Sequence, residues 1–240
     1  MLRRRRIPYD RLITVFSPDG RLLQVEYALE TVKRGSTVLG IACPGGVVLA
    51  AEVGPSARLQ DPDFSRKVFK VDEHVGAVVS GLVSDARVLI DRARVYAQSN
   101  RLMYDEPVDV KVLSERVGNI QQLCTQRSWI RPFGVSVIFG GVDKTGPRVF
   151  KTDPSGTCWG YKAVSIGAGS ETVTKILEGG YKDNITLEEA KSLAVKCLSK
   201  VIEEELEAER IRIVVVPAET KRFRELTNAE IAQYMNGGNR

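Results

Sequence analysis

A short amphipathic segment ahead of the first strand is the feature that most constrains how this chain can fold. Apolar residues recur there at steps of three and four, which places Leu22, Val25, Leu29 and Val32 on one face of a helix. The pattern predicts a helix over residues 21–33 that ends at Gly35, with Lys33 and Arg34 near its carboxyl end, where cations suit the helix dipole. Strand-like sequence begins directly after Gly35, so this helix needs a partner surface for its apolar face.

The rest of the chain alternates groups of strands with pairs of helices. We expect strands over residues 36–42, 46–53, 68–71, 75–80, 134–139, 148–152, 157–161, 163–166 and 211–216. Helices are expected over residues 85–102, 109–126 and 170–177, after a capping box that starts at Thr186, and after Thr227. This order predicts an α+β fold, a four-layer αββα sandwich whose helices cover the outer faces of two stacked sheets.

The predicted organisation is one structural domain with an added N-terminal piece. Residues 1–35 are expected to form an N-terminal segment and its helix, and residues 36–240 the sandwich. No linker-like stretch and no repeat of solenoid length divides the chain.

Charge and hydropathy argue against several classes of protein. The 35 Lys and Arg residues against 30 Asp and Glu residues give a net charge of +5, which alone does not indicate a nucleic-acid partner. The run from Arg3 to Arg6 has no interleaved aromatic residues, which favours a solvated tail over a nucleic-acid or membrane arm. No apolar run approaches the roughly 20 residues of a membrane span, and no secretory signal begins the chain. We expect a cytoplasmic protein.

No metal or cofactor site is expected. The four cysteines are far apart in the sequence and form no CxxC pair, so we interpret them as reduced and mostly packed: Cys43, Cys124, Cys158 and Cys197. The single histidine, His74, lies where a turn precedes a strand, and we expect it at the surface. One histidine and scattered cysteines do not suit a zinc site, and no nucleophile-elbow motif accompanies His74.

Seven motifs in order carry a resemblance that covers nearly the whole chain. They lie at residues 9–11, 16–22, 24–28, 34–37, 80–87, 131–136 and 153–156. Together they resemble the α-type subunits of the proteasome core particle, most closely the archaeal kind. The resemblance implies the fold of N-terminal-nucleophile hydrolases, which agrees with the αββα sandwich predicted from the pattern of strands and helices.

The resemblance also implies a function without catalysis. In this family seven α-type subunits form an outer ring, whose N-terminal segments gate the entry of unfolded protein. The matching gate residues are Tyr9, Asp10, Arg11, Pro18 and Tyr27, with Glu26 beside Tyr27. The pocket that receives the C-terminal tails of regulatory AAA+ ATPases matches Lys67, Gly81 and Leu82. Other α subunits and the β subunits are the implied partners, and we expect the apolar face of helix 21–33 to be buried against neighbouring subunits.

A self-processed hydrolase is the alternative. Catalytic β-type subunits use the hydroxyl of their first residue as nucleophile and its free α-amine as base. Ser36 matches that start, Glu52 lies near the position of the carboxylate, and Lys67 matches the lysine. With helix 21–33 attached, however, the nitrogen of Ser36 is an amide, which cannot accept the proton.

Overall fold

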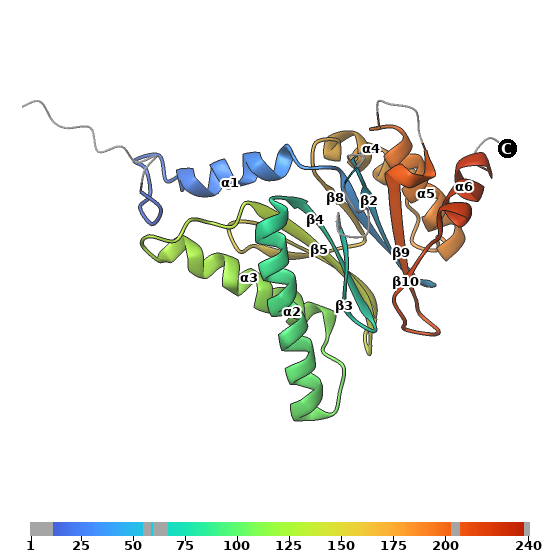
Figure 1. The fold of residues 1–240 in the computed structure, drawn as a ribbon, viewed down its shortest axis with the longest axis horizontal. Coiled ribbons are helices and arrows are strands. Elements are labelled where there is room, and N and C mark those ends of the chain that lie inside the picture. Colours follow the sequence, from blue (N-terminus) through green and yellow to red (C-terminus); the bar gives the residue numbers. More distant parts are fainter. Residues whose placement is uncertain (1–11, 55–58, 60–66, 203–206, 238–240) are drawn as a thin grey trace, which may run out of the picture.

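Two five-stranded antiparallel sheets form the centre of the molecule (Figure 1). The computed structural model describes residues 12–54, 59, 67–202 and 207–237. Sheet A has the strand order β10-β9-β2-β1-β8, with β1 Val38–Cys43, β2 Gly46–Glu52, β8 Ala163–Ile166, β9 Ile211–Pro217 and β10 Arg224–Glu225. Sheet B has the order β3-β4-β5-β6-β7, with β3 Val68–Asp72, β4 Val75–Gly81, β5 Val135–Asp143, β6 Gly146–Thr152 and β7 Cys158–Tyr161.

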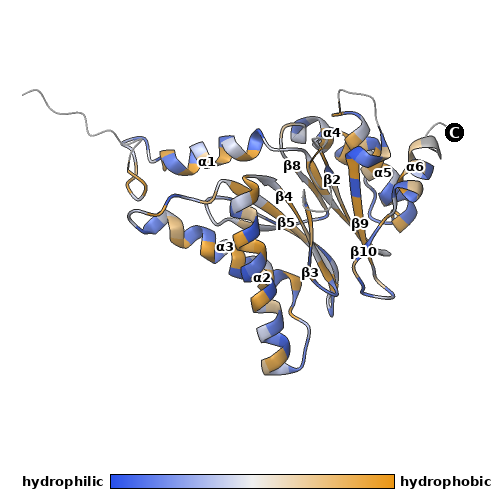
Figure 2. Cartoon of the chain, in the orientation of Figure 1, coloured by the Kyte–Doolittle hydropathy of each residue, from blue (hydrophilic) through white to orange (hydrophobic). Residues whose placement is uncertain are grey.

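Helices cover the outer face of each sheet, so the predicted four-layer sandwich with an extra N-terminal helix is confirmed. Helices α2 Val83–Tyr104 and α3 Val110–Gln126 pack on sheet B. Helices α4 Ser170–Gly180, α5 Leu187–Ser199 and α6 Asn228–Gly237 pack on sheet A, next to the short 3₁₀ turn η3 Ala208–Arg210. Helix α1 Leu23–Lys33 runs across the ends of β4 and β5 (Figure 1), and its alternating orange and blue stripes show its amphipathic character (Figure 2).

Small residues let the two sheets approach closely. A β-carbon at Gly40 would lie 2.9 Å from a methyl carbon of Ile138, and one at Gly140 would lie 2.7 Å from a methyl carbon of Val47. Interiors are close-packed, so these glycines leave the space that aliphatic side chains of the facing sheet fill. Strand β5 therefore continues through Gly140 to Asp143, whereas the sequence pattern predicted that it would end at residue 139.

The capping box predicted at Thr186 forms. The Thr186 hydroxyl accepts a hydrogen bond from the Glu189 N–H at 3.2 Å, and the Glu189 carboxylate accepts one from the Thr186 N–H at 2.8 Å. Helix α5 ends at Ser199. Ile202 follows the helix in the chain, and the Ile202 side chain is still buried. Helix α4 continues to Gly180, one turn beyond its predicted end at residue 177.

The prediction of a surface histidine is wrong. The side chain of His74 is buried, and its Nε2 lies 2.8 Å from the Val108 carbonyl oxygen. Its Nδ1 lies 3.4 Å from a carboxylate oxygen of buried Asp72, which Arg101 also contacts. The connection between α2 and α3 covers this turn, and the local sequence gives no sign of that long-range contact.

Candidate functional site

A tight turn precedes α1 and is tied to it. The Ser17 hydroxyl accepts a hydrogen bond from the Arg21 N–H at 3.1 Å, the Gly20 N–H donates to the Ser17 carbonyl at 2.9 Å, and Gly20 has a φ of +76°. The Arg21 guanidinium donates from Nε to the Glu26 carboxylate at 2.7 Å, and this hydrogen bond lowers the pKa of Glu26. Glu26 therefore fixes the turn against the helix.

The predicted gate residues fall partly within this turn and helix. Pro18 lies exposed in the turn, and the side chain of Tyr27 is 52% exposed on the outer side of α1. Tyr9, Asp10 and Arg11 lie outside the described residues.

One part of the apolar face of α1 is buried within this chain, and the other part keeps some exposed surface. Val25 and Val32 are buried in the protein's own fold, with exposed fractions of 6% and 5%. The carbonyl of Val32 accepts a hydrogen bond from the Ser80 hydroxyl at 3.1 Å, at the end of β4. The expectation that all four residues are buried against a neighbouring subunit is thus corrected for these two valines. Only Leu22 and Leu29, both half-buried, keep surface for a partner.

The backbone that follows α1 is held from two sides. Ser80 Oγ also lies 3.0 Å from the Ser36 carbonyl oxygen, a second acceptor within reach of its single proton, and the Ala168 N–H donates to the Gly35 carbonyl at 2.9 Å. A β-carbon at Gly35 would lie 2.4 Å from Ser80 Oγ and 2.5 Å from Gly81 N, so only glycine fits there. Ser80 belongs to the motif at 80–87, but sequence reasoning did not assign it this role.

Glu52 and Lys67 lie together beside the start of β1. The Glu52 carboxylate accepts a hydrogen bond from the Thr37 N–H at 3.0 Å, and the buried Thr37 hydroxyl accepts one from the Gly169 N–H at 3.0 Å. Lys67 is half-buried, and this burial lowers its pKa, while the Glu52 carboxylate acts in the opposite direction. The Lys67 ammonium therefore lies in a partly buried setting near a carboxylate. The carboxylate contacts the residue after Ser36, through the backbone.

Gly81 and Leu82 lie where β4 passes into α2. Gly81 has a φ of +115°, and a β-carbon there would lie 2.2 Å from the Gly134 carbonyl oxygen. The Leu82 N–H donates to that same oxygen at 2.9 Å, and the Leu82 side chain is 41% exposed. Gly81 is thus required by the fold itself, and Leu82 offers an apolar surface beside it.

An ion pair that the sequence analysis did not single out fixes this corner. The Arg131 guanidinium donates two hydrogen bonds to the Asp85 carboxylate, at 2.6 and 2.8 Å, and the Gly134 N–H donates a third at 2.8 Å. The hydrogen bond from Arg131 is the main cause that lowers the pKa of buried Asp85, whereas burial raises this pKa. The pair joins the first turn of α2 to the loop that leads into β5.

We expect Asp85→Asn to destabilise the protein at neutral pH. Arg131 is largely exposed, so solvent screens the pair, and a loss of roughly 1–3 kcal/mol is expected. Because the folded-state pKa of Asp85 is lowered, its stabilisation is present above the pKa of an unfolded aspartate, about 3.9. This stabilisation is lost as the pH falls through the lowered pKa that Asp85 has in the folded protein. Urea unfolding at a series of pH values should show the difference between wild type and variant shrinking in acid. A difference that is constant with pH would contradict this.

Two family descriptions match the chain. The description of the proteasome subunit matches residues 32–216, and that of the N-terminal signature of A-type proteasome subunits matches residues 9–30. The chain belongs to the proteasome subunit family. The proteasome alpha subunit of Archaeoglobus fulgidus is 47% identical over 96% of this chain and 94% of the relative. Those of Thermococcus sibiricus and Methanosarcina acetivorans are 48% and 46% identical, over 94% and 95% of this chain and 86% and 92% of the relatives.

These comparisons confirm the predicted resemblance to archaeal α-type proteasome subunits. The N-terminal signature of the proteasome family spans the turn at Ser17–Arg21 and most of α1, the same elements that the resemblance assigns to the gate. In the part of the chain that the structure describes, no helix is both long and apolar enough to cross a membrane.

Proposed function

We propose that this chain is a non-catalytic α-type subunit of the proteasome core particle, which forms an outer heptameric ring on the β subunits. One observation carries the proposal: α1 continues directly into the Gly35–Ser36 backbone, which Ser80 and Ala168 hold in place. An N-terminal nucleophile needs a free α-amine as its base. In the intact chain Ser36 has an amide nitrogen, and α1 covers the strand ends.

Within the ring we assign two roles to the elements around α1. The segment with Tyr9, Asp10, Arg11, Pro18 and Tyr27 gates the entry of unfolded protein, with Glu26 holding the turn. Lys67, Gly81 and Leu82 receive the C-terminal tails of a regulatory AAA+ ATPase, so that the particle supports ATP-dependent degradation in the cytoplasm. The family match at residues 9–30 and the half-buried cation at Lys67 support these assignments.

A self-processed amide hydrolase is the second candidate. The proximity of Glu52 and Lys67 near Ser36 favours it, because a carboxylate and a lysine tune the nucleophile in that chemistry. It requires cleavage between Gly35 and Ser36. One oxygen of the Glu52 carboxylate already accepts the Thr37 N–H.

Ser36→Ala tests this choice. We expect the assembled particle to hydrolyse peptides at nearly the wild-type rate, and the intact mass of the purified protein to match the full 26.5 kDa chain. Thr37→Ser serves as a neighbouring control for local disturbance. A product that begins at Ser36, or loss of most turnover in intact Ser36→Ala particles, would establish the hydrolase instead.

A further inference from the structure

Gly134 lies at the centre of the corner where β4 passes into α2. Its carbonyl oxygen accepts the Leu82 N–H at 2.9 Å, and a β-carbon at Gly81 would lie 2.2 Å from the same oxygen. The Gly134 N–H donates to the Asp85 carboxylate at 2.8 Å. The Arg131 guanidinium holds that carboxylate with two further hydrogen bonds. The backbone at Gly134 is therefore fixed from both sides.

The absence of a side chain at Gly134 makes room for the side chain of Leu82. A β-carbon at Gly134 would lie 2.9 Å from Leu82 Cδ1 and 3.5 Å from the Cγ2 methyl carbon of Thr31 in α1. The Leu82 backbone is fixed as well, because its carbonyl accepts the Ala86 N–H at 3.0 Å at the start of α2. The Leu82 side chain thus packs directly on Gly134, while 41% of Leu82 stays exposed.

We propose that Gly134, Asp85 and Arg131, which we call the seat, position Leu82 for the docking of an ATPase tail. The inference rests on the proposed tail pocket and adds the residues that hold it in shape. The seat keeps the apolar surface of Leu82 beside the bare backbone of Gly81 before a tail arrives. A preorganised site binds more tightly, because less conformational freedom is lost on binding. Filling or loosening the seat therefore weakens tail binding, although every group assigned to contact the tail is still present.

Gly134→Ala tests the seat directly, because the added methyl group meets the far end of a flexible side chain. The backbone at Gly134 is not left-handed, so alanine adds no strain there. Leu82 is partly exposed and turns away into solvent. Binding of a short synthetic peptide that copies the C-terminus of a regulatory AAA+ ATPase is measured by fluorescence anisotropy on particles assembled with β subunits. We expect the affinity to fall roughly three- to tenfold at unchanged particle mass.

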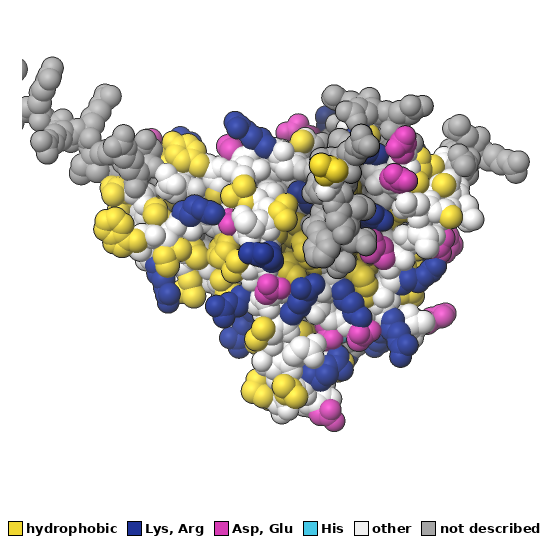
Figure 3. Space-filling model, viewed as in Figure 1, with side chains coloured by type: hydrophobic (Ala, Val, Ile, Leu, Met, Phe, Trp, Pro, Cys, Tyr) yellow, Lys and Arg dark blue, Asp and Glu magenta, His cyan; other side chains and the backbone are white. Residues whose placement is uncertain are grey.

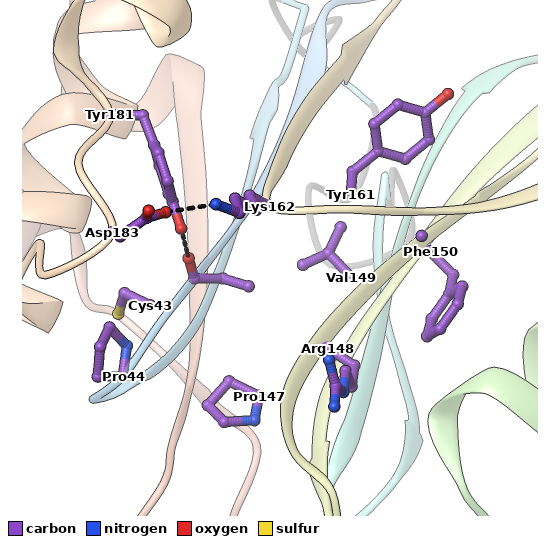
Figure 4. Close-up of a pocket in the computed structure, with 12 residues that line it drawn as sticks. Cys43, Pro44, Pro147, Arg148, Val149, Phe150, Tyr161, Lys162, Tyr181 and Asp183 are labelled. Atoms are coloured by element: carbon purple, nitrogen blue, oxygen red, sulfur yellow. Dashed lines mark hydrogen bonds and ion pairs between the residues drawn. The ribbon is translucent and has the colours of Figure 1, made fainter.

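Gly160→Ala is the matched control, because it adds the same methyl group to the wall of another cleft. A β-carbon at Gly160 would lie 3.1 Å from a ring carbon of Phe150. This cleft, of about 550 Å³, opens between strands β6 and β7 and the segment after α4 (Figure 4). Its lysine is already paired, because the Lys162 ammonium donates to the Asp183 carboxylate at 2.6 Å. Particles with Gly160→Ala should therefore bind the peptide as the wild type does.

A double-mutant cycle shows whether Gly134 acts through Leu82. In Leu82→Ala particles the methyl group added at position 134 has no leucine side chain to displace. Gly134→Ala should therefore cause little further loss of affinity in that background, because residues in contact have effects that do not add. A merely structural disturbance would cost the same factor with and without the leucine. An equal loss in both backgrounds would overturn the positioning role.

Arg131→Lys tests the support of the seat and decides the matter should the Gly134→Ala chain fail to assemble. The Arg131 side chain is largely exposed, and lysine keeps its charge but cannot form the paired hydrogen bonds of a guanidinium. The peptide affinity should again fall. If both variants bind the peptide at wild-type affinity while Lys67→Ala weakens binding, the seat is overturned and the tail pocket stands. If wild-type particles do not bind the peptide, the proposed pocket is wrong and the seat falls with it.

Discussion

Changing Lys67 to alanine is expected to abolish stimulation of the particle by a tail-docking ATPase. The half-buried ammonium lies near Glu52. Because it is partly shielded from water, an ion pair with the terminal carboxylate of a docking tail is stronger here than at an exposed lysine. A hydrogen bond to a charged group contributes about 1.5–3 kcal/mol, which is roughly ten- to a hundredfold in affinity. Several tails bind one ring, so the losses compound. Peptide hydrolysis with and without the ATPase, and binding by surface resonance, measure the effect.

The matched control for this prediction is Lys67→Arg. Burial lowers the pKa of Lys67, so its charge is lost at a lower pH than that of an ordinary lysine. Stimulation of the wild type should therefore weaken as the pH rises through that lowered value, while the arginine variant, charged throughout, should keep it. Ring assembly and basal hydrolysis should persist in both variants. If Lys67→Ala binds and responds to the ATPase as the wild type does, Lys67 is a structural residue of the Glu52 cluster, and the tail pocket lies elsewhere.

Replacing Leu22 and Leu29 together with lysine is expected to prevent ring assembly while the protein stays folded. Both side chains are half-buried in the isolated chain and keep apolar surface. Full burial of a leucine contributes about 1.5–3 kcal/mol, of which up to about a third remains for the partner. The loss recurs at every interface of a ring, and two added charges would also have to be desolvated. Native mass spectrometry shows the assembly state, and circular dichroism shows the fold.

The control for the leucine pair introduces the same charges at the free end of α2. Leu102 and Met103 are 87% and 65% exposed, and Figure 3 shows hydrophobic side chains gathered there, far from α1. Lysine at both positions should leave rings of this chain intact. Val25→Ala with Val32→Ala should instead lower the thermal stability, because those side chains are buried within the chain's own fold. Rings of normal mass from the Leu22 and Leu29 variant would show that α1 is not a ring contact.

Most of the fold could be predicted because its signals are local. Apolar runs bounded by turn residues indicated strands β1 to β4, and Thr186 with Glu189 located the start of α5. The glycines at 140–141 were misinterpreted as a strand end, because the role of Gly140 depends on Val47 in the facing sheet and that of Gly141 on the His74 carbonyl before β4. The packing partner of a glycine is not visible in its own segment.

The site was harder to predict, because its geometry depends on contacts between distant segments. The resemblance named Glu52 and Lys67 as members of one candidate site, but it could not reveal the burial that lowers the pKa of Lys67. The periodicity of α1 identified its apolar face. It could not show which of these residues pack on sheet B and which keep surface for a neighbouring subunit. Ser80, Asp85 and Arg131 were present in the motifs, but only the folded corner reveals the hydrogen bonds that they make. The motifs located the site, and the structure supplied its contacts.

In the proposed function this chain controls entry into a particle whose chemistry lies in other subunits. Deleting residues 1–11 tests that role, because α1 and its ring contacts stay in place. The measurement is the degradation rate of an unfolded protein by particles assembled with β subunits and without an ATPase, compared between the full-length and the shortened chain. We predict a several-fold increase at unchanged particle mass, and no activity in rings of the shortened chain alone. An unchanged or lower rate in intact particles, or hydrolysis by the α rings alone, would contradict the proposed gate.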